Sequence, residues 1–163
     1  MIYSAVHRTK PSMTIQWLKE QGLLVGDMLD YGCGKGLDAD YFGMDKYDAY
    51  DPNWCNISLT TDKRYDTIVC NFVFNILEPG EEFSVLENIQ RLLKEDGIAY
   101  IIVLRNARKM ASYKKDLQHY IVMSLESIRH VKRWYEIYKL TKQTDLSKLE
   151  YREIPLSSLV KQK

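Results

Sequence analysis

The stretch DYGCGKG at residues 30–36 decides the fold of this chain. It follows Asp27–Tyr31, a short apolar-rich run that is typical of a buried strand, and it precedes a short helix expected over Leu37–Phe42. Glycines are favoured where a turn needs positive φ and where a ligand approaches the backbone closely. The free N–H groups at the start of a helix also bind anions. The junction therefore predicts a ligand site, with a tight turn of small residues as the alternative.

An acid follows the next expected strand. That strand is Tyr47–Tyr50, and Asp51 comes directly after it, 21 positions beyond Asp30. An acid about 20 residues beyond a glycine loop is typical of ribose recognition, since a carboxylate can accept hydrogen bonds from both hydroxyls of one ribose. The glycine spacing is G-x-G-x-G and not the G-x-G-x-x-G of dinucleotide-binding folds, which disfavours a dehydrogenase.

Further segments repeat the alternation of strand and helix. Tyr65–Asn71 and Ile98–Leu104 predict strands that are buried on both faces. Between them, Glu81–Leu93 has the apolar spacing of a helix, with Gly97 as its expected stop. Such a succession of strands and helices predicts an α/β fold with a mostly parallel sheet and helices on its faces.

The two flanks complete this outline. A helix through Ile15–Leu18 is expected to stop at Gly22, and Ser124–Ile128 is expected to begin another helix. The segments Trp134–Leu140 and Leu149–Ile154 alternate like strands. Because no long helix separates these two strands, they are expected to form an antiparallel pair at one edge, which makes the sheet mixed.

Composition and cysteine usage indicate a single cytoplasmic domain. A hydrophobic share of 45% and a charged share of 28% are ordinary for a globular protein. No apolar run reaches the roughly 20 residues of a membrane span, and the first ten residues lack the apolar core of a signal peptide. The cysteines are odd in number without a Cys-x-x-Cys pair, which favours reduced thiols and no metal centre. We divide the domain into a leader with its helix (1–24), a ligand-binding core (25–105) and a C-terminal, substrate-side segment (106–163).

Charge is distributed unevenly along the chain. Residues 1–104 hold 9 Lys and Arg against 16 Asp and Glu, whereas residues 105–163 hold 14 against 6. Five of these basic residues follow the strand Ile98–Leu104 closely: Arg105, Arg108, Lys109, Lys114 and Lys115. This cluster favours an anionic partner, either nucleic acid or an acidic small molecule. A solvated basic loop is the alternative.

Three quoted segments together resemble the class I S-adenosylmethionine-dependent methyltransferases. They are DYGCGKG at 30–36, YDAYDPN at 47–53 and YDTIVCNFVFNILEPGEEFSVLENIQRLLKEDGIAYIIV at 65–103. The resemblance implies a Rossmann-like sheet that binds S-adenosyl-L-methionine, with the glycine loop at its methionine end and the acid at its ribose. The cofactor-binding residues that it implies are Asp30, Tyr31, Gly32, Gly34, Gly36, Asp51, Pro52, Asn56, Ile57, Asn71 and Phe72.

A narrower resemblance, to methyltransferases associated with DNA phosphorothioation genes, rests on three short features. These are His7-Arg8-Thr9, the Tyr-Asp-Pro that ends at residue 52, and the pair Asn71 and Asn75. The chain also departs from the wider family, because only 14 residues (52–65) separate Asp51 from Asp66, so the third-strand region must be reduced.

The methyl acceptor is not identified by the sequence. Phe72-Val73-Phe74 replaces the Pro-Pro-Tyr of amino-methylating enzymes, and the Pro-Cys nucleophile of cytosine-5 enzymes is absent. We therefore predict a methyltransferase of unidentified substrate, with nucleic acid favoured, and assign no catalytic residue. A domain that binds the cofactor or its demethylated product without turnover, as a sensor or partner subunit, is the alternative. The substrate-side candidates are Arg8, Asn75, Arg105, Arg108 and Lys109.

Overall fold

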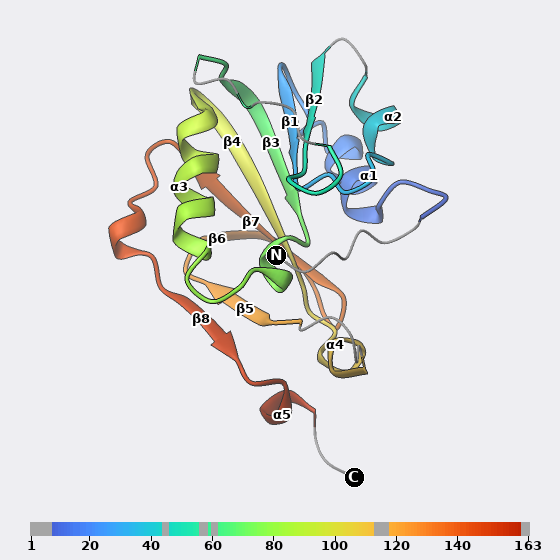
Figure 1. The fold of residues 1–163 in the computed structure, drawn as a ribbon, viewed down its shortest axis with the longest axis vertical. Coiled ribbons are helices and arrows are strands. Elements are labelled where there is room, and N and C mark those ends of the chain that lie inside the picture. The colour runs from blue at the N-terminus through green and yellow to red at the C-terminus, as the bar shows by residue number, and fades with distance from the viewer. Residues whose placement is uncertain (1–7, 44–45, 56–58, 60–61, 113–117, 161–163) are drawn as a thin grey trace.

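A computed structural model describes residues 8–43, 46–55, 59, 62–112 and 118–160. Its centre is a six-stranded sheet with the order β2-β1-β3-β4-β7-β6, beside a separate two-stranded sheet of β5 and β8 (Figure 1). The strands are β1 Met28–Tyr31, β2 Tyr47–Tyr50, β3 Tyr65–Asn71, β4 Leu93–Leu104, β5 Tyr120–Met123, β6 Glu126–Val131, β7 Tyr135–Thr141 and β8 Tyr151–Ile154. The helices are α1 Met13–Glu20, α2 Ala39–Phe42, α3 Glu82–Leu92, α4 Ala107–Ser112 and α5 Leu156–Leu159, with 3-10 turns η2 Phe74–Ile76 and η3 Leu146–Lys148.

The sheet is parallel over its first four strands and antiparallel beyond them. β1 pairs in parallel with β2 on one side and β3 on the other, and β4 continues in parallel from β3. β7 is antiparallel to β4, and β6 is antiparallel to β7. The strand order therefore reverses beside β1, which is the position where ligands bind in open α/β sheets. A mostly parallel α/β sheet with an antiparallel C-terminal strand pair confirms the predicted fold class.

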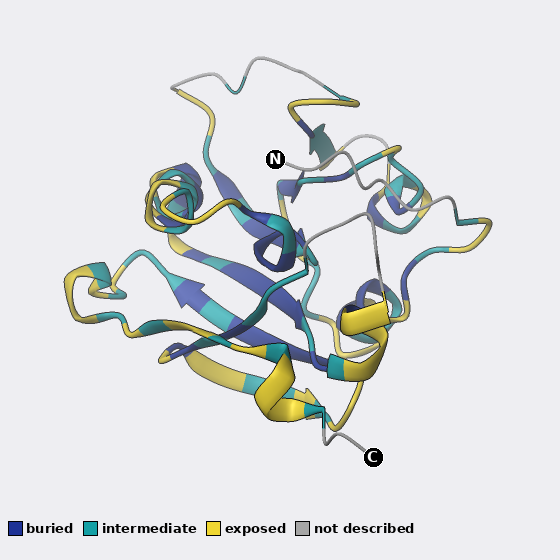
Figure 2. Ribbon diagram, turned by 60° about the horizontal axis from the view of Figure 1, so that its bottom comes forward, coloured by how far each residue is buried: buried dark blue, intermediate teal, exposed yellow. Residues whose placement is uncertain are grey.

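Alternate residues of the central strands face two separate cores. Ile68 and Ile101 point to the face that α3 covers, whereas Val69 and Ile102 point to the face of α1, as the period of two along a strand requires. These strands are predominantly buried along their length, while α5 is largely exposed (Figure 2). The apolar runs that identify β3 and β4 in the sequence thus contribute residues to the cores on both faces of the sheet.

Two predictions about the C-terminal part were wrong. The helix expected from Ser124–Ile128 is instead the edge strand β6, because pairing with β7 decides its conformation. The strand β8 does not pair with β7 either; it pairs with β5 in the separate sheet. The antiparallel pair at the sheet edge is β6 and β7.

The helix α3 ends earlier than predicted. Its last residue is Leu92, and Leu93 already has extended backbone. Gly97 does not stop the helix but lies within β4, where the register with β3 shifts between Tyr65 and Thr67. A Cβ at Gly97 would lie 2.6 Å from the Tyr65 carbonyl oxygen, so this irregular pairing requires glycine.

The connection between β2 and β3 is short, as predicted. Its described residues form only an isolated bridge, Asp51 to Cys55, and no helix or full strand. β2 is consequently the edge of the sheet. Among the helices that the structure describes, none has the length and apolar character needed to cross a bilayer.

Candidate functional site

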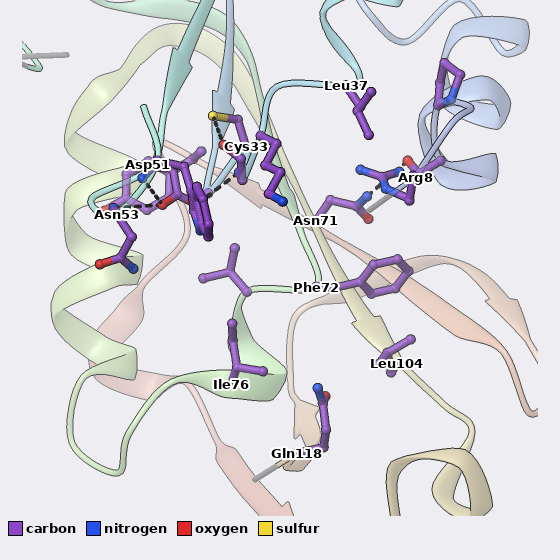
Figure 3. Close-up of a pocket in the computed structure, with 18 of the residues that line it drawn as sticks. Arg8, Cys33, Leu37, Asp51, Asn53, Asn71, Phe72, Ile76, Leu104 and Gln118 are labelled. Atoms are coloured by element: carbon purple, nitrogen blue, oxygen red, sulfur yellow. Dashed lines mark hydrogen bonds between the residues drawn. The ribbon is translucent and has the colours of Figure 1, made fainter. Parts of the chain in front are cut away.

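A cavity of about 510 Å³ opens at the carboxyl ends of the parallel strands (Figure 3). Its wall combines the loop after β1, the turn after β2, the ends of β3 and β4, and parts of α1 and α4. Small-molecule sites typically have volumes of about 300–1,000 Å³. The strand ends that the sequence marks therefore meet around one space of the size of a ligand site.

The glycine loop adopts a conformation that favours glycine. Gly32, Gly34 and Gly36 have φ values of 81°, 56° and 76°, a region that side chains with a Cβ disfavour. A Cβ at Gly32 would also overlap Cγ2 of Val73. The backbone N–H of Gly32 donates to the Tyr50 carbonyl at 2.6 Å, which ties the loop to the end of β2.

Asp51 connects the glycine loop to the turn that follows β2. Its Oδ2 accepts a hydrogen bond from the backbone N–H of Gly34 at 3.0 Å. Its Oδ1 accepts from the backbone N–H groups of Asn53 at 2.9 Å and Trp54 at 3.2 Å. All four residues line the cavity. A single carboxylate therefore organises both segments that the sequence predicts to bind one ligand.

Aromatic side chains border this end of the cavity. Tyr31 packs against Tyr50, with ring centroids 5.1 Å apart, and its hydroxyl accepts from the side-chain amide of Asn88 at 3.0 Å. Trp54 is 48% exposed, and the ammonium of Lys35 lies 4.9 Å from the centre of its ring. The exposed tryptophan gives a flat apolar surface at the rim.

Asn71 joins the end of β3 to the start of α1. Its amide donates to the Ser12 hydroxyl, and its carbonyl oxygen accepts from the Thr14 hydroxyl, both at 3.0 Å. The side chain also lines the cavity. Arg8 lines the cavity too, but its guanidinium is held by Asp38, with Nη2 to Oδ2 at 3.0 Å. We expected the guanidinium of Arg8 to face a ligand, but in the structure it forms an ion pair with Asp38.

The other half of the cavity is mainly apolar. Figure 3 shows Cys33 and Asp51 at one end, and Ile76 and Gln118 toward the other. Phe72 lies between these ends and has φ of 60°, an uncommon and strained value for an aromatic residue. The cavity is also lined by Met13, Leu104, Asn106, Lys109, Met110 and Trp134.

Asp30 lies beneath the cavity and not in its wall. It is buried, and the Tyr47 hydroxyl donates to it at 3.4 Å. Burial, reinforced by the nearby charge of Asp38, raises the pKa of Asp30 to about 7. The acid that begins the glycine stretch therefore contacts Tyr47 of β2 instead of the cavity, and its burial favours the neutral carboxyl group.

Two of the predicted substrate-side residues, Asn75 and Arg105, are buried and do not line the cavity. The Asn75 side chain is fully buried; it accepts from the Leu104 backbone N–H at 2.9 Å and donates to the His119 carbonyl at 2.8 Å. Arg105 is only 4% exposed and forms an ion pair with Glu136. Both residues lie behind the cavity wall, where Asn75 connects β4 to the backbone of His119 and Arg105 pairs with Glu136 of β7.

The remaining predicted residues are distributed differently. Pro52 and Lys109 line the cavity, whereas the exposed Arg108 does not. Asn56 and Ile57 lie outside the described residues, as do Lys114 and Lys115. In the described part of the chain, no three His, Cys, Asp or Glu side chains come together as metal ligands.

Sequence reasoning missed several residues of the apolar half, among them Met110 and Gln118. Gln118 lies two residues before β5, and β5 lies close to β4 and η2 in the fold. No local pattern marks such a residue, because only long-range packing brings it to the cavity. The apolar run Tyr120–Met123 was the available signal, and it identifies the strand rather than the site.

Comparisons with known proteins support one family. Residues 9–149 match the family model described as "Methyltransferase domain". The fold is similar to N-methyltransferase NodS from Bradyrhizobium japonicum WM9 in complex with S-adenosyl-L-homocysteine, at 14% identity and a TM-score of 0.52, covering 77% of this chain and 82% of that chain. A comparison with curated protein sequences finds no match.

Two further solved structures have similar folds. One is the 1,6-didemethyltoxoflavin-N1-methyltransferase of Burkholderia thailandensis with bound 1,6-didemethyltoxoflavin and S-adenosylhomocysteine, at 17% identity and a TM-score of 0.51, covering 77% of this chain and 74% of that chain. The other is the PH0226 protein from Pyrococcus horikoshii OT3, at 12% identity and a TM-score of 0.53, covering 77% and 88%.

Proposed function

The chain belongs to the methyltransferase-domain family, with the class I S-adenosylmethionine-dependent fold, and we propose that it methylates a small molecule held in the apolar half of its cavity. The observation that carries this proposal is the division of one cavity into two unlike halves. One half has the glycine loop and Asp51, and the other has apolar and amide side chains. A transfer reaction needs both reactants in one space, because positioning is its main requirement.

The residues of the first half fit S-adenosylmethionine. Gly32 and Gly34 line the cavity, whereas Gly36 does not. The absence of a side chain at Gly34 leaves its backbone open to a close ligand, and the Asp51 carboxylate lies beside it. We propose that Asp51 accepts a hydrogen bond from the ribose, that Trp54 borders the adenine, and that Asn71 lies near the methionine end. When bound, the cofactor supplies an electrophilic methyl group on a sulfonium sulfur.

The second half favours a small acceptor over nucleic acid. Nucleic-acid recognition was expected from the basic residues after β4, but Arg105 is buried in its pair with Glu136 and cannot meet a phosphate. Of the residues of that cluster that the structure describes, Arg105, Arg108 and Lys109, it is Lys109 that lines the cavity. The cavity is also lined by aromatic and aliphatic side chains, among them Phe72, Ile76 and Leu104, and such side chains are typical of small-molecule sites. An acidic small molecule with its anion near Lys109 is compatible with this arrangement.

A labelling experiment separates these acceptors. The protein is incubated with S-adenosylmethionine that carries a tritiated methyl group, together with small-molecule, RNA and DNA fractions of a cell extract. We expect label in the small-molecule fraction. Label in RNA or DNA would overturn the proposed acceptor. Binding of S-adenosylhomocysteine in calorimetry without transfer to any fraction would instead favour a cofactor sensor or a partner subunit.

A further inference from the structure

Trp134 is a large aromatic residue that stays exposed at the wall of the cavity. It lines the cavity and is 45% exposed, although tryptophan usually buries most of its surface in a folded protein. The backbone N–H of Trp134 donates to the Val131 carbonyl at 2.9 Å, and its carbonyl accepts from the Arg105 N–H at 2.9 Å. Because its backbone groups are occupied in this way, the indole ring is the part of Trp134 that is available to a ligand.

The turn that carries Trp134 is fixed to the end of β4. Arg105, which holds the Trp134 carbonyl, is buried, and its guanidinium donates to Glu136 and to the Tyr138 hydroxyl, both at 2.7 Å. The indole lies edge-on to the ring of the buried Tyr135, with centroids 5.7 Å apart and 69° between the ring planes. A side chain that is already held in place loses little conformational freedom when a ligand binds to it.

Trp134 continues an apolar row along one edge of the sheet. β3, β4 and β7 are neighbours in the sheet; Phe72 directly follows β3, Leu104 ends β4, and Trp134 directly precedes β7. Because β7 is antiparallel to β4, its start lies at the same edge as the carboxyl ends of β3 and β4. All three residues line the cavity, and Figure 3 shows Phe72 and Leu104 among them. We call Phe72, Leu104 and Trp134 the apolar row.

Backbone strain occurs at both aromatic positions of the apolar row. In the described part of the chain, the residues other than glycine with positive φ are Phe72, at 60°, and Arg133, at 61°. Phe72 belongs to the apolar row, and Arg133 directly precedes Trp134. Residues held in such sparsely populated conformations cluster at ligand sites. The strain is thus found at the two turns that bring aromatic rings to the cavity.

We propose that an aromatic ring of the methyl acceptor stacks on the indole of Trp134, with Phe72 and Leu104 forming the adjacent wall. Contacts between aromatic rings are more favourable than their buried area alone accounts for, so this surface selects aromatic molecules over saturated ones of similar size. The inference rests on the proposed function, since it concerns the acceptor in that same cavity. The substrate class is then a small molecule with an aromatic ring, and Trp134 is a specificity-determining residue.

A matched pair of probes tests this selection. 2-Naphthol and 2-decalol share a carbon skeleton and a hydroxyl group, but only 2-naphthol is aromatic. Each is titrated into the protein saturated with S-adenosylhomocysteine, and binding is followed by ligand-detected nuclear magnetic resonance. For the unchanged protein we expect 2-naphthol to bind roughly two- to tenfold more tightly, the scale of one aromatic pair. The ratio should fall at least about twofold in Trp134→Leu, which keeps an apolar side chain, and should be largely kept in Trp134→Phe, which keeps a ring.

Trp54 provides the matched control. It also lines the cavity and is 48% exposed, but its backbone N–H is bound to Asp51 at the other end. At saturating S-adenosylhomocysteine, Trp54→Leu should keep the preference for 2-naphthol. Trp134→Leu should keep the affinity of the unchanged protein for S-adenosylhomocysteine in calorimetry, which also reports that this variant is folded.

The outcomes distinguish failure of this inference from failure of the proposed function. If the unchanged protein does not bind S-adenosylhomocysteine, the proposed function fails. If it does bind, the role of Trp134 is overturned by any of three results: the unchanged protein does not prefer 2-naphthol, Trp134→Leu keeps the preference, or Trp54→Leu loses it to the same extent.

Discussion

The carboxylate of Asp51 accepts a hydrogen bond from the backbone N–H of Gly34 at 3.0 Å, so the acid after β2 and the loop after β1 form one unit. Two more N–H groups, from Asn53 and Trp54, occupy the other oxygen. A carboxylate offers about four acceptor positions, so about one stays open to a ligand, on Oδ2. In this arrangement Asp51 can serve one ribose hydroxyl, rather than the two that the spacing of the sequence suggested.

Replacing Asp51 should therefore weaken cofactor binding in two ways. Asp51→Ala removes a charge-assisted acceptor for the ribose and releases the N–H of Gly34. We expect S-adenosylhomocysteine to bind about 1.5–3 kcal/mol more weakly in calorimetry, the scale for a hydrogen bond to a charged group. Asp40→Ala is the matched control, because Asp40 is exposed on α2 and does not line the cavity. Equal affinities for the two variants would contradict the assignment of Asp51.

Gly32 should be far less tolerant of a side chain than a glycine with similar backbone elsewhere. Gly32→Ala combines φ of 81° with overlap against Val73, whereas Gly22 has φ of 69° with no heavy atom within 4 Å of an added Cβ. Both substitutions carry backbone strain, of about 1 kcal/mol or more, but only the first displaces the loop. We expect chemical denaturation to show that the free energy of unfolding falls more in Gly32→Ala than in Gly22→Ala. Gly32→Ala should also bind S-adenosylhomocysteine more weakly. Equal losses with unchanged binding would show that the loop adapts freely.

The cofactor half was more predictable from the sequence than the acceptor half. The sequence pattern predicts the strands β1 and β2, and the carboxyl ends of neighbouring parallel strands must lie at one edge of the sheet, so Gly34 and Asp51 could be placed together without coordinates. The positive φ angles of the loop fall on its glycines, which are visible in the sequence. Local pattern is sufficient for this kind of site.

The residues of the acceptor half are brought together by long-range packing, which a local sequence pattern does not predict. Arg105 looks like the first residue of an exposed basic segment, yet the pairing of β4 with β7 brings Glu136 and Tyr138 to its guanidinium. The strand β6 was misread as a helix for the same reason, since it is defined by its partner strand. Gln118 reaches the cavity only because Asn75 holds the adjacent backbone.

Gln118 should lower the stability of the ligand-free protein. Its Oε1 is buried without a donor among the described residues, so Gln118→Leu should increase the free energy of unfolding by about 1–3 kcal/mol. For a chain of this length that corresponds to a rise in melting temperature of roughly 2–4 °C per kcal/mol. Differential scanning calorimetry without ligand measures the shift.

Gln90 provides the matched control for this prediction. Its side-chain amide donates to the carbonyls of Thr141 at 3.0 Å and Thr144 at 2.8 Å. The same change, Gln90→Leu, removes satisfied hydrogen bonds and should lower the melting temperature. If both glutamine variants lose stability to a similar extent, the Gln118 amide is satisfied in solution.

Asp30 should give the stability of the protein a distinct pH dependence. Burial, together with the charge of Asp38, raises its pKa from 3.8 to about 7 in the folded chain, while a hydrogen bond from Tyr47 and the charges of Arg8 and Asp51 modulate it. Between these two values the unfolded chain releases a proton that the folded chain retains, so stability falls as pH rises from about 4 to about 7. At roughly 1.4 kcal/mol per pKa unit the loss is up to about 4 kcal/mol.

Asp30→Asn removes this titration and isolates its contribution. The difference in free energy of unfolding between variant and unchanged protein, measured by urea denaturation at several pH values, should grow in favour of the variant from pH 4 to pH 7 and then level off. Asp48→Asn serves as a control, because the contribution of Asp48 to stability should change with pH in the opposite direction. Partial burial of Asp48 is outweighed by hydrogen bonds from Lys63 and Tyr65, which lower its pKa. Its contribution is therefore present above the unfolded pKa and lost as pH falls. A difference for Asp30→Asn that does not vary with pH would mean that the pKa of Asp30 is not raised by folding.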